Sequence, residues 1–218
     1  MISQFQISNN VITLFNRNII CDLDDVLGDF APVINHHMNQ ASDIQLSVSD
    51  YLAYDYYERH NLSKDEFGEI IRKEEVFLKM PVKKGAVEGL QMLVDKGFTI
   101  HIVTARGGFN FSHSQTREWL EKNNVPHHHL HIVDTSITPK SEVYNSIAGG
   151  AACLIDDAPY NIIDAMDSTP SLLPIIIDQP WNRAFKGIDK WNSDYHGQRF
   201  NTVKDFADRV EYQVRAAA

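Results

Sequence analysis

The chain has little that would cross-link it or anchor it in a membrane. Its 218 residues include only two cysteines, Cys21 and Cys153, which are too few for a disulfide framework. No apolar run approaches the roughly 20 residues of a membrane-spanning helix, and residues 1–18 lack the basic start and apolar run of a signal peptide. We therefore expect a folded protein of the cytoplasm, with both cysteines as small core residues.

Positive charge is also scarce. Lysine and arginine number 20 against 29 aspartates and glutamates, which gives a formal net charge of −9. This excess disfavours nonspecific binding to a nucleic-acid polymer or to an anionic membrane, and we expect neither partner. If the substrate is itself an anion, a chain of this charge needs a cation at its site.

Short apolar runs alternate with helical patterns along most of the chain. The runs predict buried strands over 18–21, 98–103, 131–133, 152–155 and 175–177. Helical spacing predicts helices over 85–96, 112–123, 140–147, 159–166 and 202–214. Ser112 and Gln115 have the spacing of a capping box, and Gly97 can end the helix before it. The alternation is typical of an α/β fold, a Rossmann-like parallel sheet with helices on both faces.

The stretch from Phe30 to Met80 breaks this alternation. It contains no β-run, is rich in tyrosine, and includes a second capping box, Ser63 with Glu66, at the start of a helix that we expect to reach Phe77. We predict a helical cap over 31–81, inserted into a core made of 1–30 and 82–218. Residues 1–17 fit either an added β-strand or a subunit contact, and we allow for a homodimer.

Polar side chains follow the ends of the predicted strands. Asp22 and Asp24 come after the first strand, Thr104 ends the second, Lys140 opens the helix after the third, and Asp156-Asp157 ends the fourth. Ligands of open parallel sheets bind beyond the carboxyl ends of the strands. If the acids share one pocket, they repel one another, and a divalent cation can offset that repulsion.

The chemistry that fits these groups is phosphoryl transfer through an aspartyl-phosphate. A carboxylate can attack phosphorus, and the charge that spreads over the transferring group requires cations and hydrogen-bond donors around it. Mg²⁺ prefers oxygen ligands such as carboxylates and phosphate. Lys140 can neutralise charge, Thr104 can donate a hydrogen bond, and Asp24 can protonate the leaving oxygen and then deprotonate water.

Asp22-Leu23-Asp24-Asp25-Val26-Leu27 after an apolar strand resembles the first motif of the haloacid dehalogenase superfamily. Thr104, Lys140 and the Asp156-Asp157 pair resemble its second, third and fourth motifs in order, and the separation of 82 positions between Asp22 and Thr104 leaves room for a cap. The resemblance implies that Asp22 is the nucleophile and Asp24 the acid and base. It also implies Mg²⁺ held by Asp22, by the backbone carbonyl of Asp24 and by one of the paired acids, of which we favour Asp157 with Asp156 in support. The second acid, Asp24, favours a phosphatase.

Within the superfamily, the chain most resembles 5′(3′)-deoxyribonucleotidases and their bacterial relatives. The residues that carry this likeness are Asp24 to Phe30, Pro81 to Glu88, Leu154 to Pro159 and Asp178 to Arg183. It implies hydrolysis of small substrates, nucleoside monophosphates, with cap aromatics against the base and substrate contacts from Phe30, Ala105 and Arg106. Thr104-Ala105-Arg106 differs from the Thr-Ser-Pro of the animal enzymes. There are two alternatives. The protein is a phosphatase for another small phosphorylated metabolite, or it is a phosphoacceptor or binding protein that does not turn over.

Other conspicuous groups have simpler interpretations. The histidine run 127–129 together with His131 enters a strand, where successive side chains point to opposite faces, so we interpret it as a partly exposed strand start and not as a metal site. Arg183 fits a structural ion pair better than a substrate contact. We expect hinges for the cap near Phe30 and near Pro81-Val82, because closure of a cap excludes bulk water from the substrate.

Overall fold

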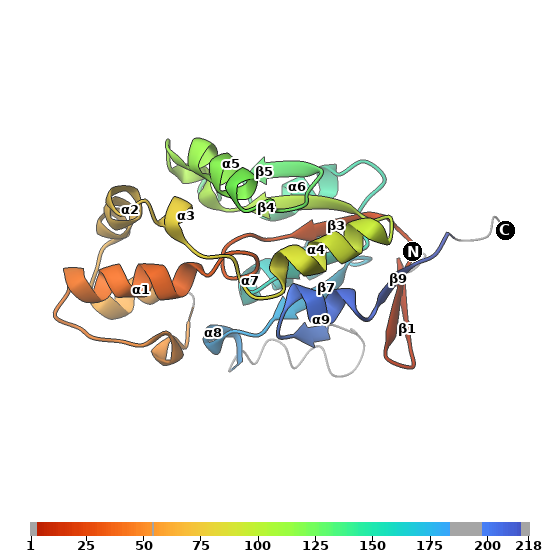
Figure 1. The fold of residues 1–218 in the computed structure, drawn as a ribbon, viewed down its shortest axis with the longest axis horizontal. Helices are drawn as coiled ribbons and strands as arrows, with labels where there is room; N and C mark the ends of the chain where they lie inside the picture. Colours follow the sequence, from red (N-terminus) through yellow and green to blue (C-terminus); the bar gives the residue numbers. More distant parts are fainter. Residues whose placement is uncertain (1–3, 54, 184–197, 215–218) are drawn as a thin grey trace.

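The computed structural model describes residues 4–53, 55–183 and 198–214. It is built around one six-stranded parallel sheet, with an all-helical segment at one end and a small second sheet near the two chain ends (Figure 1). Among the described residues, no helix is long and apolar enough to cross a membrane.

The central sheet has the strand order β5-β4-β3-β6-β7-β8, and every neighbouring pair is parallel. Its strands are β3 (Asn18–Cys21), β4 (Thr99–Thr104), β5 (His129–Ile132), β6 (Cys153–Asp156), β7 (Leu173–Ile177) and β8 (Gln198–Phe200). Five of them are the five strands expected from the apolar runs, with their bounds shifted by up to two residues. The predicted α/β class with a parallel sheet is confirmed.

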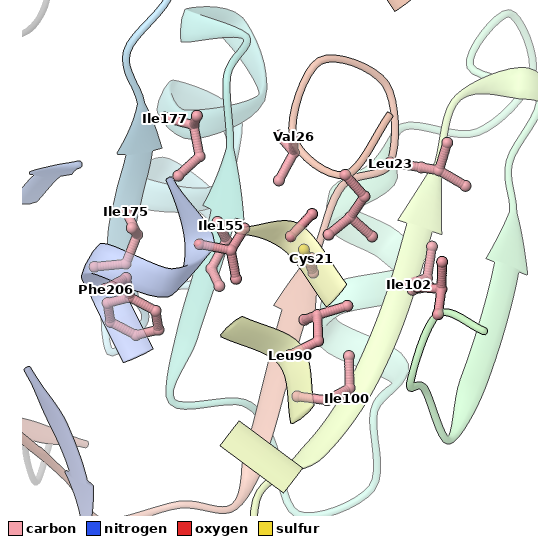
Figure 2. Packing of buried hydrophobic residues seen from close by; sticks show 14 of the residues in the cluster. Cys21, Leu23, Val26, Leu90, Ile100, Ile102, Ile155, Ile175, Ile177 and Phe206 are labelled. Atoms are coloured by element: carbon pink, nitrogen blue, oxygen red, sulfur yellow. The ribbon is translucent and has the colours of Figure 1, made fainter. Parts of the chain in front are cut away.

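Alternate residues of β3, β4 and β6 enter two separate cores, one on each face of the sheet. On one face, Cys21, Ile102 and Ile155 pack against Leu90 of α4 (Ala86–Asp95) and Phe206 of α9 (Val203–Ala207) (Figure 2). The same core takes in Trp119 of α5 (Ser112–Lys122). The opposite core joins β3, β4 and β6 to α6 (Lys140–Ser146) and α7 (Pro159–Ser168). Burial on both faces is the reason that these strands read as unbroken apolar runs.

The segment between β3 and α4 is helical, with no strand among its described residues. It contains α1 (Phe30–Ala41), η1 (Val48–Asp50), η2 (Tyr56–His60), α2 (Lys64–Lys73) and α3 (Val76–Lys79), at the end of the molecule far from the chain termini (Figure 1). The Ser63–Glu66 capping box forms as expected. The helix does not reach Phe77, because Glu75 takes a left-handed conformation with φ of 53° and starts a new turn.

The two chain crossings that connect this segment to the core lie side by side. Gly28 and Val82 form an isolated antiparallel bridge, and the Asp29 amide donates to the Pro81 carbonyl at 2.8 Å. An ion pair of 2.7 Å between Lys83 Nζ and Asp29 Oδ1 links the same two crossings. These are the positions where we expect the hinges of the cap.

The second sheet shows that one expectation is wrong and that residues 1–17 include added β-strands. It has the order β1-β2-β9, from β1 (Phe5–Ser8), β2 (Val11–Leu14) and β9 (Val210–Tyr212), so residues 1–17 contribute added strands. The single helix expected over 202–214 is therefore wrong beyond residue 207. The chain leaves the helix because Lys96 Nζ binds the carbonyls of Ala207 and Val210, and β9 pairs with β2.

Of three smaller expectations, two are confirmed and one is wrong. Gly97, with φ of 88°, follows α4 as predicted, whereas Ser112 is the first residue of α5 and makes no capping box. The histidines 127–129 are exposed and His131 is half-buried, which agrees with a partly exposed strand start.

Candidate active site

The carboxyl edge of the central sheet brings together four of the predicted groups. Asp22 follows β3, Thr104 ends β4, Asp156 ends β6, and Lys140 is the first residue of α6. All four are buried, with at most 4% of any residue exposed. Because β3 lies between β4 and β6, Asp22 sits at the centre of the group.

Lys140 is the cation that contacts the buried acids. Its Nζ lies 2.8 Å from Asp22 Oδ1 and 3.3 Å from Asp156 Oδ2. Burial alone would lower the pKa of Lys140, but attraction by Asp156 and Asp22 raises it well above its usual value. For the acid Asp22, burial disfavours the charged form and raises the pKa to about 7, although attraction by Lys140 acts in the opposite direction. Lys140 is therefore charged at neutral pH and binds directly to the central acid.

Asp22, Asp156 and Asp157 can hold a metal ion together. One carboxylate oxygen from each lies within 4.8 Å of the others, and among the described residues this is the group of acids, histidines and cysteines that meets such a criterion. Three buried carboxylates against one lysine leave the site with an excess of negative charge. Hard oxygen donors in this number suit Mg²⁺.

The paired acids, Asp156 and Asp157, differ in the hydrogen bonds that their carboxylate oxygens accept. Asp156 accepts hydrogen bonds from the Ala158 amide and from Asn161 Nδ2, in addition to its contact with Lys140. Asp157 accepts from Trp181 Nε1 through Oδ2, but its Oδ1 is buried without a hydrogen-bond partner. A buried, unpaired carboxylate oxygen is costly, and a cation bound at Oδ1 would remove that cost. The residues present thus fit a divalent metal.

Asp24 is not a member of this three-acid group and pairs with an arginine. Arg106 Nε and Nη2 donate to the two Asp24 oxygens at 2.9 and 2.5 Å. The guanidinium also contacts Thr116 Oγ1 at 3.1 Å and lies 3.9 Å from the centre of the Phe77 ring. Arg106 is thus buried, and joins the core to α3 of the helical segment.

Asp24 and Arg106 line a cavity of about 1180 Å³ between the helical segment and the core. Phe30 and Ala105, two more of the predicted substrate contacts, are also in its wall. The aromatic side chains of the wall are Phe30, Tyr56, Tyr57, Phe67, Phe77, Phe109, Phe111 and Tyr160. Asp22, Asp156 and Asp157 are not part of the lining, whereas Asp24, two residues after Asp22, is.

Two further polar groups face this region. Thr104 Oγ1 is buried and has no hydrogen-bond partner, so it has a donor to spare. Asp25 has φ of 56°, and its Oδ1 accepts from the Ala31 amide at 2.9 Å, which fixes the turn between β3 and α1. Burial raises the pKa of Asp25 to about 8.

Sequence reasoning missed the residues that hold the paired acids. Asn161 binds Asp156, and Trp181 and Asn182 bind Asp157. The run 178–183 did stand out as a point of family likeness, but nothing in it indicated contact with an acid 24 residues earlier. Arg183 forms the structural ion pair expected of it, 2.6 Å from Asp178.

Comparison with known proteins gives consistent relatives. Residues 16–198 match the family described as "5′ nucleotidase, deoxy (Pyrimidine), cytosolic type C protein". A candidate nucleotidase of Halalkalibacterium halodurans is 23% identical over 170 residues, which cover 74% of this chain and 80% of that protein.

Solved structures share the fold at low identity. A predicted phosphatase from Clostridium acetobutylicum superposes with a TM-score of 0.59 at 18% identity, covering 89% of this chain and 97% of the other. A haloacid dehalogenase superfamily hydrolase from Ehrlichia chaffeensis gives 0.53 at 15% identity, covering 88% and 95%.

Proposed function

Because the chain belongs to the cytosolic type C family of 5′-nucleotidases, phosphatases of the haloacid dehalogenase superfamily, we propose that it hydrolyses (deoxy)nucleoside 5′-monophosphates with Mg²⁺ and an aspartyl-phosphate on Asp22. The observation that carries the proposal is the buried group of Asp22, Asp156, Asp157 and Lys140, close in the chain to Asp24, which lines an aromatic cavity. Residues 31–81 serve as the cap of this site, on a core of 1–30 and 82–218.

The metal would be held by Asp22, by the backbone carbonyl of Asp24 and by Asp157, with Asp156 in support. The unpaired Oδ1 of Asp157 favours it as the direct ligand, because both oxygens of Asp156 already accept hydrogen bonds. When bound, Mg²⁺ offsets the charge of the acids and of the phosphate, so that two anions can approach each other.

Asp22 attacks the phosphorus through a carboxylate oxygen, and the bond between phosphorus and the ester oxygen breaks. Asp24 gives a proton to that leaving oxygen, which departs as the nucleoside hydroxyl. Asp24 then takes a proton from water as the water oxygen attacks phosphorus, and the bond to Asp22 breaks to release inorganic phosphate. Lys140 and Thr104 stabilise the charge on the transferring group.

Arg106 must share its charge between Asp24 and the substrate. In this structure both Asp24 oxygens accept from Arg106, which holds the carboxylate at the cavity wall. An incoming phosphate competes for the same guanidinium, since arginine binds either anion in a forked geometry. Such an exchange frees Asp24 to carry its proton.

The cavity suits a flat, partly apolar leaving group. Phe30 and Phe77 lie 6.0 Å apart between ring centres, and Phe109 and Phe111 continue the aromatic wall from the core side. A base that stacks on such rings gains binding energy without depending on base identity. We therefore propose that Phe30, Ala105 and Arg106 contact the substrate.

Release of inorganic phosphate from a panel of ribo- and deoxyribonucleoside monophosphates and sugar phosphates tests the proposal. We expect activity that needs Mg²⁺, that EDTA abolishes, and that is highest on nucleotides. Asp22→Asn should lower the rate at least about a thousandfold, because it removes the nucleophile, whereas Asp43→Asn, at an exposed position, should leave it unchanged. Full activity in Asp22→Asn, or phosphoprotein that accumulates without turnover, would contradict the mechanism. A clear preference for sugar phosphates would contradict the substrate class.

A further inference from the structure

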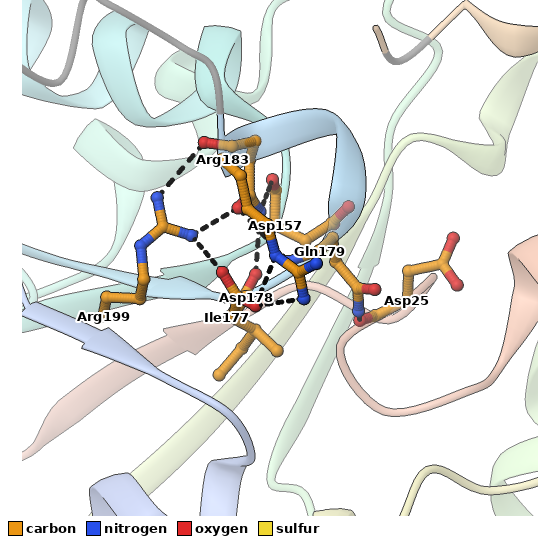
Figure 3. A network of polar contacts seen from close by, with 8 residues as sticks. Asp25, Asp157, Ile177, Asp178, Gln179, Arg183 and Arg199 are labelled. Carbon is orange, nitrogen blue, oxygen red and sulfur yellow. Dashed lines mark hydrogen bonds and ion pairs between the residues drawn. The ribbon is translucent and has the colours of Figure 1, made fainter. Parts of the chain in front are cut away.

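The segment that follows β7 reaches back to the acid site, although none of its residues takes part in the steps above. It consists of Asp178, Gln179 and the short helix α8 (Pro180–Arg183). Figure 3 shows Gln179 directed toward Asp25 and the backbone of this segment beside Asp157. The segment therefore contacts both acidic loops of the site.

Trp181 makes the contact that bears on the metal. Its Nε1 donates to Asp157 Oδ2 at 2.8 Å, and the indole is 3% exposed. With Oδ2 occupied in this way, rotation of the carboxylate about its Cβ–Cγ bond is restrained. Oδ1, which has no hydrogen-bond partner, is then the oxygen left for a cation.

Neighbouring residues fix the backbone around that contact. Asn182 Nδ2 donates to the carbonyls of Asp157 and Ile177, at 2.9 and 2.8 Å, so it joins the ends of β6 and β7. Gln179 Nε2 donates to the Asp25 carbonyl at 2.8 Å, in the loop that carries Asp22 and Asp24. This segment thus links both acidic loops, in addition to the link that Lys140 makes between Asp22 and Asp156.

The segment is itself anchored from the edge of the sheet. Arg199 of β8 donates to Asp178 Oδ1 at 2.7 Å and to the side chain and carbonyl of Asn182 (Figure 3). Arg183 binds the other Asp178 oxygen at 2.6 Å. This anchoring indicates that Trp181 is held in place before any ligand binds.

We propose that Trp181 is a positioning residue that orients Asp157 for the metal, with Oδ2 held by the indole and Oδ1 directed to the cation. The inference rests on the proposed function only in taking Mg²⁺ as the ligand. Partners of this kind around metal ligands typically contribute 10- to 100-fold to metal affinity. The ring centre of Trp181 also lies 5.9 Å from that of Tyr56 in η2, so the same indole packs against the helical segment.

Calorimetric titration of the full chain with MgCl₂ alone tests the role of Trp181. Trp181→Phe keeps an aromatic ring and removes the N–H donor, and we expect its Kd for Mg²⁺ to rise about tenfold. Trp119→Phe is the matched control, because Trp119 is equally buried and donates to the Met80 carbonyl at 2.8 Å, away from the acids. The control should lower Tm and leave the Mg²⁺ Kd unchanged.

Phosphate release at increasing Mg²⁺ provides a second measurement. If Trp181 positions the metal ligand, Trp181→Phe needs more Mg²⁺ for half activity but approaches the wild-type rate at saturation, whereas a purely structural defect lowers the rate at every concentration. Should Trp181→Phe fail to fold, Arg199→Gln replaces it in the test. Arg199 is partly exposed, and its replacement removes a hydrogen bond to Asn182, so the Kd for Mg²⁺ should rise to a smaller extent.

The outcomes separate the two proposals. An unchanged Mg²⁺ Kd in the folded variant, or an equal rise in Trp119→Phe, would overturn the role of Trp181. Wild-type protein that binds Mg²⁺ but hydrolyses no nucleotide would overturn the proposed substrate, while the calorimetric comparison would still decide on Trp181. Wild-type protein that binds no Mg²⁺ would overturn both.

Discussion

His101 lies in β4 opposite His129 of the edge strand β5, with the two rings stacked at 4.5 Å between centres. The His131 ring also stacks against that of His101, at 5.6 Å between centres. Burial, together with repulsion from the neighbouring imidazoles, lowers the pKa of His101 from 6.5 to about 4. Above pH 4 the folded protein therefore keeps this ring neutral, while the unfolded chain takes up a proton below about pH 6.5.

Stability should consequently fall as the pH is lowered from about 6.5 toward 4, since the unfolded state binds the extra proton. The slope from this group is at most about 1.4 kcal/mol per pH unit. We expect the free energy of unfolding in urea to drop by about 1–2 kcal/mol more between pH 7 and pH 5 for wild type than for His101→Gln. His113→Gln, at an exposed position of α5, should follow wild type. Equal drops in all three proteins would show that His101 is not the source.

At the scale of single residues, the sequence was informative where chemistry depends on position along a strand. Asp22, Thr104 and Asp156 each end or follow a predicted strand, Lys140 begins a predicted helix, and the parallel sheet brings the four to one edge. The partners of Arg106 and Asp157 were out of reach, because they depend on contacts between residues 82 and 24 positions apart. Nothing in the local pattern around Trp181 indicates that its N–H meets a carboxylate.

At the scale of elements, helices α4 and α9 pack closely against each other at Gly89. A Cβ at this position would lie 2.5 Å from the Lys204 amide nitrogen and 2.6 Å from the Val203 carbonyl carbon. Backbone cannot move aside as a flexible side chain can. The absence of a side chain at Gly89 thus sets the distance between the two helices.

Gly89→Ala should therefore separate α4 from α9 and lower the free energy of unfolding by about 1–3 kcal/mol, the usual cost of overpacking. For a chain of this length, that corresponds to a fall in Tm of roughly 2–4 °C per kcal/mol. Gly108→Ala is the control, because its nearest neighbour to an added Cβ is at 3.6 Å. A Tm for Gly89→Ala equal to that of the control would mean that the helices adjust freely.

Two element boundaries set by local caps were predictable, but the capping box expected at Ser112 does not form, and tertiary pairing decides other boundaries. The Ser63–Glu66 capping box and Gly97 act within one turn, and both were correct. The end of α9 was missed because β9 is stabilised by β2, far away in sequence. The apolar spacing of 202–214 fits a helix as well as it fits a short helix followed by a half-buried strand.

For the molecule as a whole, three buried carboxylates on a chain of net charge −9 would make stability depend on a cation bound between them, as proposed. A ligand that binds only the folded state at 100 times its Kd stabilises it by about 2.7 kcal/mol. We expect Mg²⁺ to raise Tm by about 5–10 °C over protein in EDTA.

Asp157→Asn should lose most of that increase in Tm. Without Mg²⁺ it should be at least as stable as wild type, because one of three neighbouring negative charges is gone. Asp43→Asn, on the surface, should keep the full increase. Thermal unfolding followed by circular dichroism measures all three, and an undiminished Mg²⁺ effect in Asp157→Asn would argue against Asp157 as a ligand.

The overall architecture was largely predictable because an all-parallel sheet leaves a strong record in sequence, with each strand apolar on both faces. What remained open was how the parts join. The paired crossings at Gly28 and Val82, and the ion pair from Asp29 to Lys83, connect residues about fifty positions apart. Such contacts follow from the folded arrangement and have no periodic signal.

The pairing of β2 with β9 has a consequence for how the chain is made. Ile12 lies beside Val210, so β2 leaves the ribosome long before the strand that completes its sheet is synthesised. Ile12 and Leu14 belong to the same core as β3 and α4. During translation, one edge of β2 therefore stays unpaired while β3, β4, β5, β6 and β7 can already assemble, and both sheets are completed only when β8 and β9 arrive. Contacts this distant in sequence are the slowest to form, which makes this small sheet the late step of biogenesis.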